Sequence, residues 1–248
     1  MHSTGHVITM IELSVVIPTF SRVGILLWAL EEYKKQSLDK DKYEIIVVND
    51  GGTEIPQREY PNNIRILNQE NKGPAAARNL GVANARGKKV LFVGDDCIPH
   101  RHLLYRHWLA HRLKGFPCSI QGYTDWHPAI PPDDFHRFLH GQTKLGGGGL
   151  QANWRALKDE KGNWVSSDTP LDGGFFLTTN ISVDRDTFLF YGGFPESLRE
   201  ASWEDISAGI TLLSFGVRTY LCNDAKNWHY HRQTLDGFVK RQIKEGRW

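Results

Sequence analysis

The sequence predicts an α/β domain in which a mostly parallel central sheet is flanked by helices. Four short apolar runs, at 12–18, 43–48, 64–67 and 90–93, have the length and continuity of strands buried on both faces of a sheet. Strands that alternate with helices at this spacing form right-handed crossovers in a parallel sheet. The pattern changes after Pro99, where we expect a smaller, antiparallel portion.

The helices of the first half are indicated by apolar spacing and by their end residues. The strand at 12–18 closes with Pro18, and the helix after it carries an apolar face of Val23, Leu26, Leu27 and Leu30. A second helix begins near Pro74, a residue that suits the first helical turn, and Gly87 fits just past its end. That helix leads into the strand at 90–93.

Two adjacent carboxylates, Asp95 and Asp96, follow the apolar run at 90–93. In open α/β sheets, ligands bind beyond the carboxyl ends of the strands, so these acids lie at the expected binding edge. Like charges at this range oppose each other's ionisation, and a divalent cation relieves that cost. Carboxylates with water suit Mg²⁺ or Mn²⁺. Taken alone, an Asp-Asp pair is more often a solvated acidic turn, and the rest of the chain favours the metal site.

The second half is less regular than the first. A helix is expected around 103–108 and a strand at 119–126. The segment 127–170 is rich in proline, glycine and polar residues, with four glycines at 146–149. A long segment of this kind is usually a functional loop or disordered, so we expect a mobile lid or acceptor loop there.

Three further elements complete the second half. An antiparallel strand is expected within 173–183, a helix opens at 203–205, and a last strand is expected at 217–221. Two histidines and a basic tail follow that strand. The helix bears Ile206, Ile210 and Leu213 and should close near Gly216.

Length and composition limit the class of protein. A chain of 248 residues suits one domain with a smaller lobe, and a net charge of +2 gives no case for a nucleic-acid partner. The cysteines at 97, 118 and 222 lack metal-like spacing, which favours a reducing compartment. No apolar run reaches the length of a membrane span, so we expect a cytoplasmic protein with a disordered leader at 1–10.

Short motifs follow one another along nearly the whole chain. They are Val-Val-Ile-Pro-Thr-Phe at 15–20, Val-Val-Asn-Asp-Gly-Gly at 47–52, Asn-Lys-Gly-Pro-Ala-Ala-Ala-Arg-Asn-Leu-Gly at 71–81, Phe-Val-Gly-Asp-Asp-Cys-Ile-Pro at 92–99, Gly-Gly-Phe-Pro-Glu at 192–196, Trp-Glu-Asp at 203–205 and the closing histidines. In this order and spacing they resemble the inverting glycosyltransferases of family 2, which have the GT-A fold.

The resemblance implies a single GT-A domain at 11–248 that moves a sugar from a nucleotide donor, most simply a UDP-sugar, to a hydroxyl acceptor such as a sugar, glycolipid or glycoconjugate. The nucleotide-sugar-binding half would be 11–100 and the acceptor-binding half 101–234. A basic helix would occupy 235–248.

The resemblance assigns the donor site to the first half. Asp50 would accept the ring N–H of uracil or thymine, although Asn-Asp-Gly-Gly alone is also an ordinary turn. Asp95 would face the ribose, and nearby cations would bind the base or the diphosphate. The expected nucleotide-binding set is Pro18, Thr19, Phe20, Arg22, Asp50, Lys72, Gly73, Arg78 and Asp95.

The metal, Mn²⁺ or Mg²⁺, would be bound by Asp96 together with a histidine. A neutral imidazole is a sound ligand for Mn²⁺, and the resemblance puts His229 at the ligand position. His231 is the alternative, and we expect the two to face opposite ways on an extended segment. Gly94 stands where many relatives carry another acid, which leaves fewer ligands.

The acceptor hydroxyl is a poor nucleophile and needs a positioned base. By resemblance Asp205 is that base, and Glu204 holds the acceptor or the base itself. Trp203, Glu204 and Asn180 are the expected acceptor contacts. The alternative is that the two acids only favour the helix N-terminus through its dipole.

The tail at 235–248 allows two interpretations. Its helical pattern puts basic residues beside one apolar face, so it either docks on its own domain or contacts a membrane surface. The chain stops within this basic sequence, which leaves open that the native protein continues. The apolar face is formed by Leu235, Phe238, Val239 and Ile243.

Two other functions compete with sugar transfer. A sugar-nucleotide pyrophosphorylase would be expected to have a Gly-rich loop after the first strand, and Pro-Thr-Phe-Ser-Arg at 18–22 is not such a loop. A non-catalytic carbohydrate-binding domain would use tryptophan platforms, yet tryptophans are as common in cores. Binding alone gives no reason for the acids and the histidine at the expected site to occur together.

Overall fold

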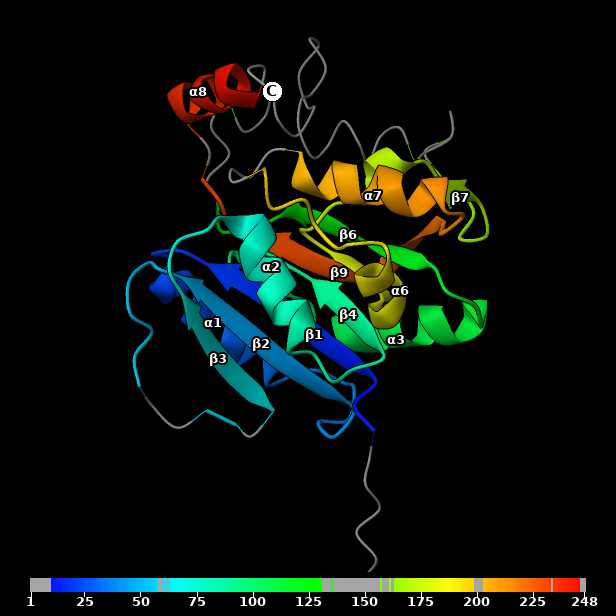
Figure 1. The fold of residues 1–248 in the computed structure, drawn as a ribbon, viewed down its shortest axis with the longest axis horizontal. Coiled ribbons are helices and arrows are strands. Elements are labelled where there is room, and N and C mark those ends of the chain that lie inside the picture. Colours follow the sequence, from blue (N-terminus) through cyan, green and yellow to red (C-terminus); the bar gives the residue numbers. More distant parts are fainter. Residues whose placement is uncertain are drawn as a thin grey trace, which may run out of the picture.

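A computed structural model of the protein describes residues 10–57, 60–61, 63–130, 135, 157, 161, 163–198, 203–232 and 234–245. The leader at 1–9, the four glycines at 146–149 and the last three residues lie outside this part of the chain. The described elements, shown in Figure 1, are β1 (Leu13–Thr19), α1 (Val23–Tyr33), β2 (Tyr43–Asp50), β3 (Ile64–Gln69), α2 (Pro74–Ala83), β4 (Lys89–Phe92), β5 (Cys97–Pro99), α3 (Leu103–Lys114), β6 (Ser119–Trp126), β7 (Pro170–Leu171), η1 (Gly173–Phe175), β8 (Ile181–Asp184), α6 (Arg185–Phe190), α7 (Glu204–Ser214), β9 (Thr219–His229) and α8 (Leu235–Glu245).

The strands form one sheet in the order β3-β2-β1-β4-β8-β6-β9-β5, with β7 paired to β9. From β3 to β4 all pairings are parallel, as the alternation of strands and helices predicts. Strand β8 is antiparallel to both β4 and β6. Strands β6 and β9 are parallel to each other, so the second half is mixed rather than simply antiparallel. The expected α/β architecture is confirmed.

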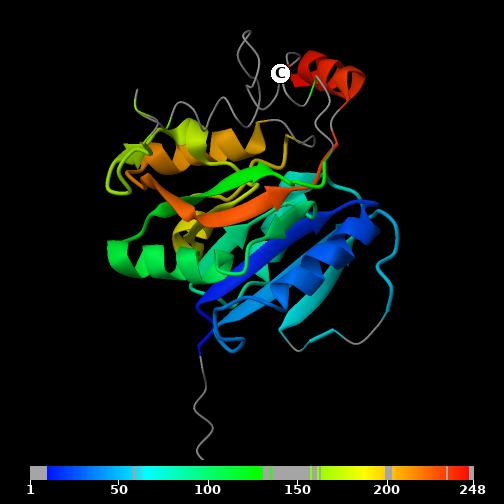
Figure 2. The ribbon, with the colours of Figure 1, turned by 180° about the vertical axis from the view of Figure 1, so that it is seen from behind.

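Helices cover both faces of the sheet. Figure 1 shows α2 and α6 in front of it, and Figure 2 shows α1 and α3 on the opposite face. The apolar cluster under α1 and α3 contains Leu26, Leu30 and Leu103, and the cluster on the other face contains Phe92 and Phe188. Because β1, β2 and β4 are buried on both sides, their sequences read as continuous apolar runs.

Several element boundaries differ from the expected ones. The strand expected within 173–183 is only β8, and a 3₁₀ turn, η1, precedes it. The last strand, β9, continues to His229 instead of ending at 221. Helix α2 ends at Ala83, before Gly87.

The buried face of α7 is not formed by its large apolar residues alone. Ile210 is 56% exposed and Leu213 36%, whereas the buried residues include Ala208 and Leu212. The small residues at 208–209 let α7 lie directly against η1, and a Cβ at Gly209 would come within 2.3 Å of the Gly173 carbonyl oxygen. Apolar periodicity weights large side chains, so it missed a face formed by small ones.

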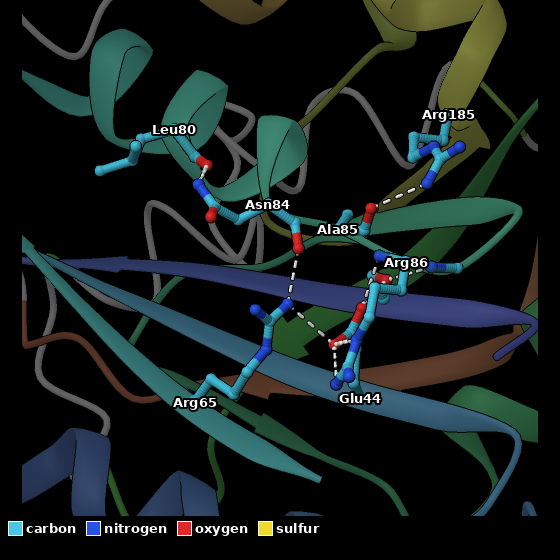
Figure 3. Close-up of polar contacts among 9 residues, drawn as sticks. Glu44, Arg65, Leu80, Asn84, Ala85, Arg86 and Arg185 are labelled. Atoms are coloured by element: carbon cyan, nitrogen blue, oxygen red, sulfur yellow. Dashed lines mark hydrogen bonds and ion pairs between the residues drawn. The ribbon is translucent and has the colours of Figure 1, made fainter.

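A buried carboxylate anchors the sheet at the end opposite to Asp50 (Figure 3). Glu44, near the start of β2, accepts hydrogen bonds from Ser14 Oγ at 2.7 Å, Arg65 Nη2 at 2.9 Å and the Arg86 backbone N–H at 2.6 Å. Burial would raise the pKa of Glu44, but its hydrogen bonds to Arg86 and Ser14 and the charge of Arg65 hold it below its usual range. This cluster joins β1, β2 and β3 to the segment after α2.

Helix α8 presents part of its apolar face to solvent. Leu235 is 58% exposed, Val239 45% and Ile243 54%. Phe238 instead packs edge-to-face on Phe135, with ring centroids 5.6 Å apart. Among the described residues of the expected apolar face, Phe238 is thus the one with an aromatic contact to another segment. Among the described residues, no helix is long and apolar enough to cross a bilayer.

Candidate active site

The carboxyl ends of β1, β2 and β4 meet at one edge of the sheet because these strands are parallel. Thr19 and Asp50 are the last residues of β1 and β2, and Asp95 and Asp96 follow β4. Strand β5 then pairs with the end of β9, with Cys97 opposite His229. Parallel strands, a tight turn and an antiparallel pair thereby bring together acids and a histidine that are far apart in sequence.

Asp95 and Asp96 share one cationic partner, Arg22. Asp95 is fully buried, accepts a hydrogen bond from Thr19 Oγ1 at 2.7 Å and forms an ion pair with Arg22. Arg22 also forms an ion pair with Asp96 Oδ2. Burial raises the pKa of Asp95 to about 6, against the opposing charge of Arg22. Arg22 and Thr19, both expected at the donor site, are therefore in contact with the acidic pair.

Two imidazoles lie near the same Asp96 oxygen that pairs with Arg22. His229 Nε2 lies 3.3 Å and His231 Nδ1 3.7 Å from Asp96 Oδ2. Burial would raise the pKa of Asp96, but His229, Arg22 and His231 hold it below its usual range. The two histidine rings stack with centroids 5.6 Å apart. The expectation that they face opposite ways is wrong, because residues two apart in extended backbone lie on the same face.

The donor set around Asp96 fits a divalent cation. One ligand atom each from Asp96, Cys97 and His229 lie within 4.8 Å of one another. A carboxylate with an imidazole suits Mn²⁺, and a carboxylate with water suits Mg²⁺. His229 is held by stacking on Trp126, with centroids 5.2 Å apart, and is less exposed than His231. Of the two histidines, His229 is thus closer to Asp96 and more firmly packed.

Asp50 is held at the N-terminus of α2. Its Oδ1 accepts from Gln69 Nε2 at 2.6 Å and from the Lys72 N–H at 2.9 Å, and its Oδ2 accepts from the Gly73 N–H at 2.9 Å. Gly73 has a φ of +92°, which a side chain would strain, so the glycine allows the tight approach. Asp50 is only 4% exposed. Lys72, expected at the nucleotide-binding site, contacts Asp50 through its backbone N–H and not through its charged side chain.

The two acids at the start of α7 have different surroundings. Glu204 is 3% exposed and binds Arg78 Nη1 at 2.8 Å. Arg78 also lies over the Phe194 ring, 5.5 Å from its centroid. We expected Arg78 to bind the nucleotide and Glu204 to contact the acceptor, but the two neutralise each other in the interior. A buried charge requires such a partner.

Within the part of the chain that the structure describes, Asp205 is hydrogen bonded outside its own helix only by long contacts with Thr178. Its Oδ2 lies 3.4 Å from both the backbone N and the Oγ1 of Thr178, and its Oδ1 accepts from the Ile206 N–H at 2.8 Å. Burial and the neighbouring Glu204 raise the pKa of Asp205 to about 6, and Arg78 opposes this. A carboxylate with a pKa near neutrality suits general-base chemistry. Trp203, beside it, is 44% exposed.

Asn180 does not contact an acceptor. Its side chain is fully buried and its amide is hydrogen bonded to Tyr123, Ala225 and His107. The expectation of an acceptor contact is therefore wrong, because no part of this side chain reaches the surface. Phe20, in contrast, is 52% exposed, and Pro18 lies partly buried on β1.

Sequence reasoning missed two contributors to the site. Thr178 contacts Asp205, and Trp126 stacks on His229. Trp126 lies opposite His229 in the parallel pairing of β6 with β9. No local pattern distinguishes these residues from core ones, because the strand expected within 173–183 includes Thr178 and a tryptophan is as common in a core as in a site.

Comparisons with known proteins show which sequences and folds this chain resembles. The family described as Glycosyl transferase family 2 matches residues 14–180, more than half of the chain. The uncharacterized glycosyltransferase YfnE of Bacillus subtilis is 24% identical over 253 residues, which cover 87% of this chain and 64% of YfnE. The chain spans only about a fifth of several other curated relatives that it matches.

Two solved structures share the fold. The mannosyltransferase PcManGT from Pyrobaculum calidifontis, in complex with GDP-Man and Mn²⁺, has a TM-score of 0.66 at 15% identity and covers 94% of this chain and 61% of its own. S. aureus TarS 1-349 in complex with UDP-GlcNAc has a TM-score of 0.63 at 16% identity, covering 90% of this chain and 60% of its own.

Proposed function

Because this chain belongs to glycosyl transferase family 2, we propose that it transfers a sugar from a UDP-sugar to an acceptor hydroxyl, with inversion at the anomeric carbon and with a divalent metal. The observation that carries this proposal is the grouping of Asp95, Asp96 and His229 at the carboxyl edge of the sheet. Acids and an imidazole converging at that edge are suited to a metal-bound diphosphate.

Asp50 is the proposed base-reading residue. Its oxygens accept three hydrogen bonds from the protein, and a carboxylate has about four acceptor positions. The remaining position can accept a ring N–H, which uracil has at N3 and cytosine lacks in its neutral form. This favours a uracil donor over a cytosine donor. TarS bound to UDP-GlcNAc, which shares the fold, is consistent with such a donor.

The metal is proposed to be Mn²⁺ or Mg²⁺, held by Asp96 and His229. When bound, it supplies Lewis-acid stabilisation to the departing diphosphate. Arg22, which contacts both Asp95 and Asp96, has its guanidinium beside the same position and can bind a phosphate oxygen. PcManGT, in complex with Mn²⁺, is a structural relative of the same fold.

Asp205 is proposed as the general base of a single displacement. Its carboxylate takes the proton of the acceptor hydroxyl while the acceptor oxygen forms a bond to the anomeric carbon. The bond from that carbon to the diphosphate oxygen breaks with its electron pair, so the nucleoside diphosphate leaves as the anion. Attack opposite to the leaving group inverts the configuration, and no covalent sugar–enzyme intermediate is formed.

The test measures nucleoside diphosphate release from a panel of UDP-, GDP- and dTDP-sugars, with Mn²⁺ or Mg²⁺ and without added acceptor. We expect slow hydrolysis of one or more UDP-sugars that disappears in excess EDTA and in Asp96→Ala. A non-catalytic carbohydrate-binding domain would bind sugars but release no nucleotide. No release from any donor by the folded chain, or full release in EDTA, would contradict the proposal.

A further inference from the structure

Asn180 fills a break in the pairing of two strands. Strands β6 and β9 change register between Gly122 and Tyr123, so that Gly122 lies opposite Cys222 and Tyr123 opposite Lys226. The Asn180 amide enters at this break and Nδ2 donates to the Tyr123 carbonyl at 3.1 Å and the Ala225 carbonyl at 2.8 Å. A Cβ at position 122 would lie 2.4 Å from Nδ2, so only glycine leaves room.

The partners of Asn180 determine the tautomer of His107. Both carbonyls can only accept, so the Asn180 NH₂ group faces them and Oδ1 faces His107 Nε2 at 2.8 Å. His107 Nε2 must therefore carry the proton. His107 is fully buried, and burial lowers its pKa to about 4, so the ring is neutral and Nδ1 is an acceptor.

The chain of hydrogen bonds continues in one direction beyond His107. Ser182 Oγ lies 2.8 Å from His107 Nδ1 and must donate to it, so Ser182 accepts from His111 Nε2, also at 2.8 Å. Burial and the charge of Lys89 lower the pKa of His111, which is neutral as well. Its Nδ1 faces the Cys118 thiol, a weak donor at 3.9 Å. Each side-chain polar atom in this series of hydrogen bonds, from Asn180 to Cys118, is thus assigned as either a donor or an acceptor.

One side of Asn180 leads to the proposed base. The Asn180 N–H donates to the Leu177 carbonyl at 3.1 Å and closes a turn, which Gln121 fastens by accepting from the Leu177 N–H at 2.8 Å. Thr178, within that turn, supplies both groups that lie 3.4 Å from Asp205 Oδ2. A rotation of the turn would move these two groups relative to Asp205.

The other side of Asn180 leads to the proposed metal ligand. The register break makes β9 bulge at 223–225, and the strand resumes at Lys226 and continues to His229. The carbonyl of Ala225, bound by the Asn180 amide, lies at the end of this bulge. The bulge therefore sets the position from which His229 reaches Asp96.

We propose that Asn180, oriented by His107, is a positioning residue that fixes both the Thr178 contact of Asp205 and the placement of His229 on β9. This inference rests on the roles proposed above for Asp205 and His229. It assigns to Asn180 and His107 no contact with donor, acceptor or metal.

The test compares three variants of the full chain. His107→Phe keeps a ring but removes the donor to Asn180, and we expect kcat and Mn²⁺ affinity each to fall about 10- to 100-fold, the range found for residues that orient a ligand. His107→Gln restores a donor in place of Nε2 and should recover both. The matched control, His111→Phe, removes a buried histidine one turn further along α3. It should lower the melting temperature while leaving kcat and Mn²⁺ affinity within a factor of about two, since Ser182 can still donate to His107.

Histidine ¹⁵N spectra of the wild-type chain test the same inference without any variant. We expect His107 and His111 as neutral Nε2–H tautomers at pH 7. A protonated Nδ1 on His107, or unchanged kcat and Mn²⁺ affinity in a folded His107→Phe, would overturn the inference. Loss of kcat in His111→Phe equal to that in His107→Phe would also overturn it, because a general structural effect would then explain both. A wild-type chain that releases no nucleotide contradicts the proposed function instead, and the spectra and Mn²⁺ titrations still decide the inference.

Discussion

Asp95, which is buried, and Asp205, which is half-buried, both have a pKa that desolvation raises to about 6, but their neighbours suit them to different roles. Asp95 is held by Thr19 and by the charge of Arg22, which keeps its position and favours its ionised form. The contacts of Asp205 with Thr178 are long, at 3.4 Å, and therefore weak. The more loosely held carboxylate, Asp205, is therefore the one that we propose as the base.

The first prediction concerns Asp205→Asn. Removing a general base costs about 10²–10⁴-fold in rate. A raised carboxyl pKa means that the ionised form destabilises the fold at neutral pH, so the neutral amide should raise the melting temperature. Wild-type kcat should fall as the pH drops below about 6, because Asp205 becomes protonated. Kinetics, UDP calorimetry and thermal unfolding check these expectations, with Asp186→Asn, an exposed acid, as control. Normal transfer by Asp205→Asn would exclude it as the base.

The second prediction concerns Asp50→Ala. The variant leaves the N–H groups of Lys72 and Gly73 and the uracil N3–H without their acceptor. A lost buried hydrogen bond costs about 1–3 kcal/mol, so UDP affinity should fall by about 5- to 150-fold. Calorimetry with UDP measures this, and Asp39→Ala, an acid on the surface, is the control. Unchanged affinity would mean that the base binds elsewhere.

Helix α7 places Glu204 and Asp205 side by side at its N-terminus, yet only Glu204 is neutralised, by Arg78 from α2. Successive residues of a helix point about 100° apart, so Glu204 faces Arg78 while Asp205 faces Thr178. The helix thereby creates an asymmetric pair from two adjacent acids. Arg78 also links two helices of the site. Its own helix, α2, has at its N-terminus the N–H that binds Asp50, and α7 contains Asp205.

The third prediction is a shift of the pH profile in Glu204→Gln. Without Glu204, Asp205 loses a like-charged neighbour and keeps the opposing charge of Arg78, so its pKa should fall below about 6. Transfer should then persist to lower pH than in the wild type. The melting temperature should decrease, because Arg78 is left buried without its partner. An inactive variant with an unchanged acid limb would make Glu204 the base instead.

The fourth prediction concerns strand β2, which carries Asp50 at one end and Glu44 near the other. Glu44→Gln breaks a buried ionic cluster, and such changes cost about 3–5 kcal/mol when the partner is buried. Arg65 and Arg86 are partly exposed, so we expect the lower end or less. Denaturant unfolding measures this, with Glu12→Gln of the exposed Lys88 pair as control.

Glu44 should also make the stability of the protein depend on pH. The folded-state pKa of Glu44 is depressed. Its contribution is therefore complete above the unfolded pKa, about 4.3, and is lost as the pH falls through the lower folded value. The stability difference between wild type and Glu44→Gln should vanish at acidic pH. Persistence of the whole difference at low pH would contradict the ionic role.

At the scale of the whole molecule, the contact between Asp96 and His229 links two strands that are far apart in sequence, because Asp96 follows β4 and His229 ends β9.

The fifth prediction is that Mn²⁺ raises the melting temperature and EDTA reverses this. A ligand at about 1,000 times its Kd stabilises by about 4 kcal/mol. Asp96→Ala should abolish the shift, and His229→Ala should reduce it. An undiminished shift in Asp96→Ala would place the ion elsewhere.

The sequence alone determined the strands β1, β2 and β4, the helices between them and the acids that follow β4. Those features follow from local patterns: continuous apolar runs, end residues and carboxylates directly after a strand. The order of the motifs also indicated the family, which the match at 14–180 confirms.

Tertiary structure decided what depends on contacts between distant segments. Sequence patterns could not show that Glu204 binds Arg78, that both histidines face Asp96 or that α7 packs through small residues. Asn180 is the clearest case, because we expected it to contact the acceptor, whereas its amide is buried at the register break of β6 and β9. A polar residue's role depends on which partners satisfy its hydrogen bonds, and those partners are chosen by the packing of the whole chain.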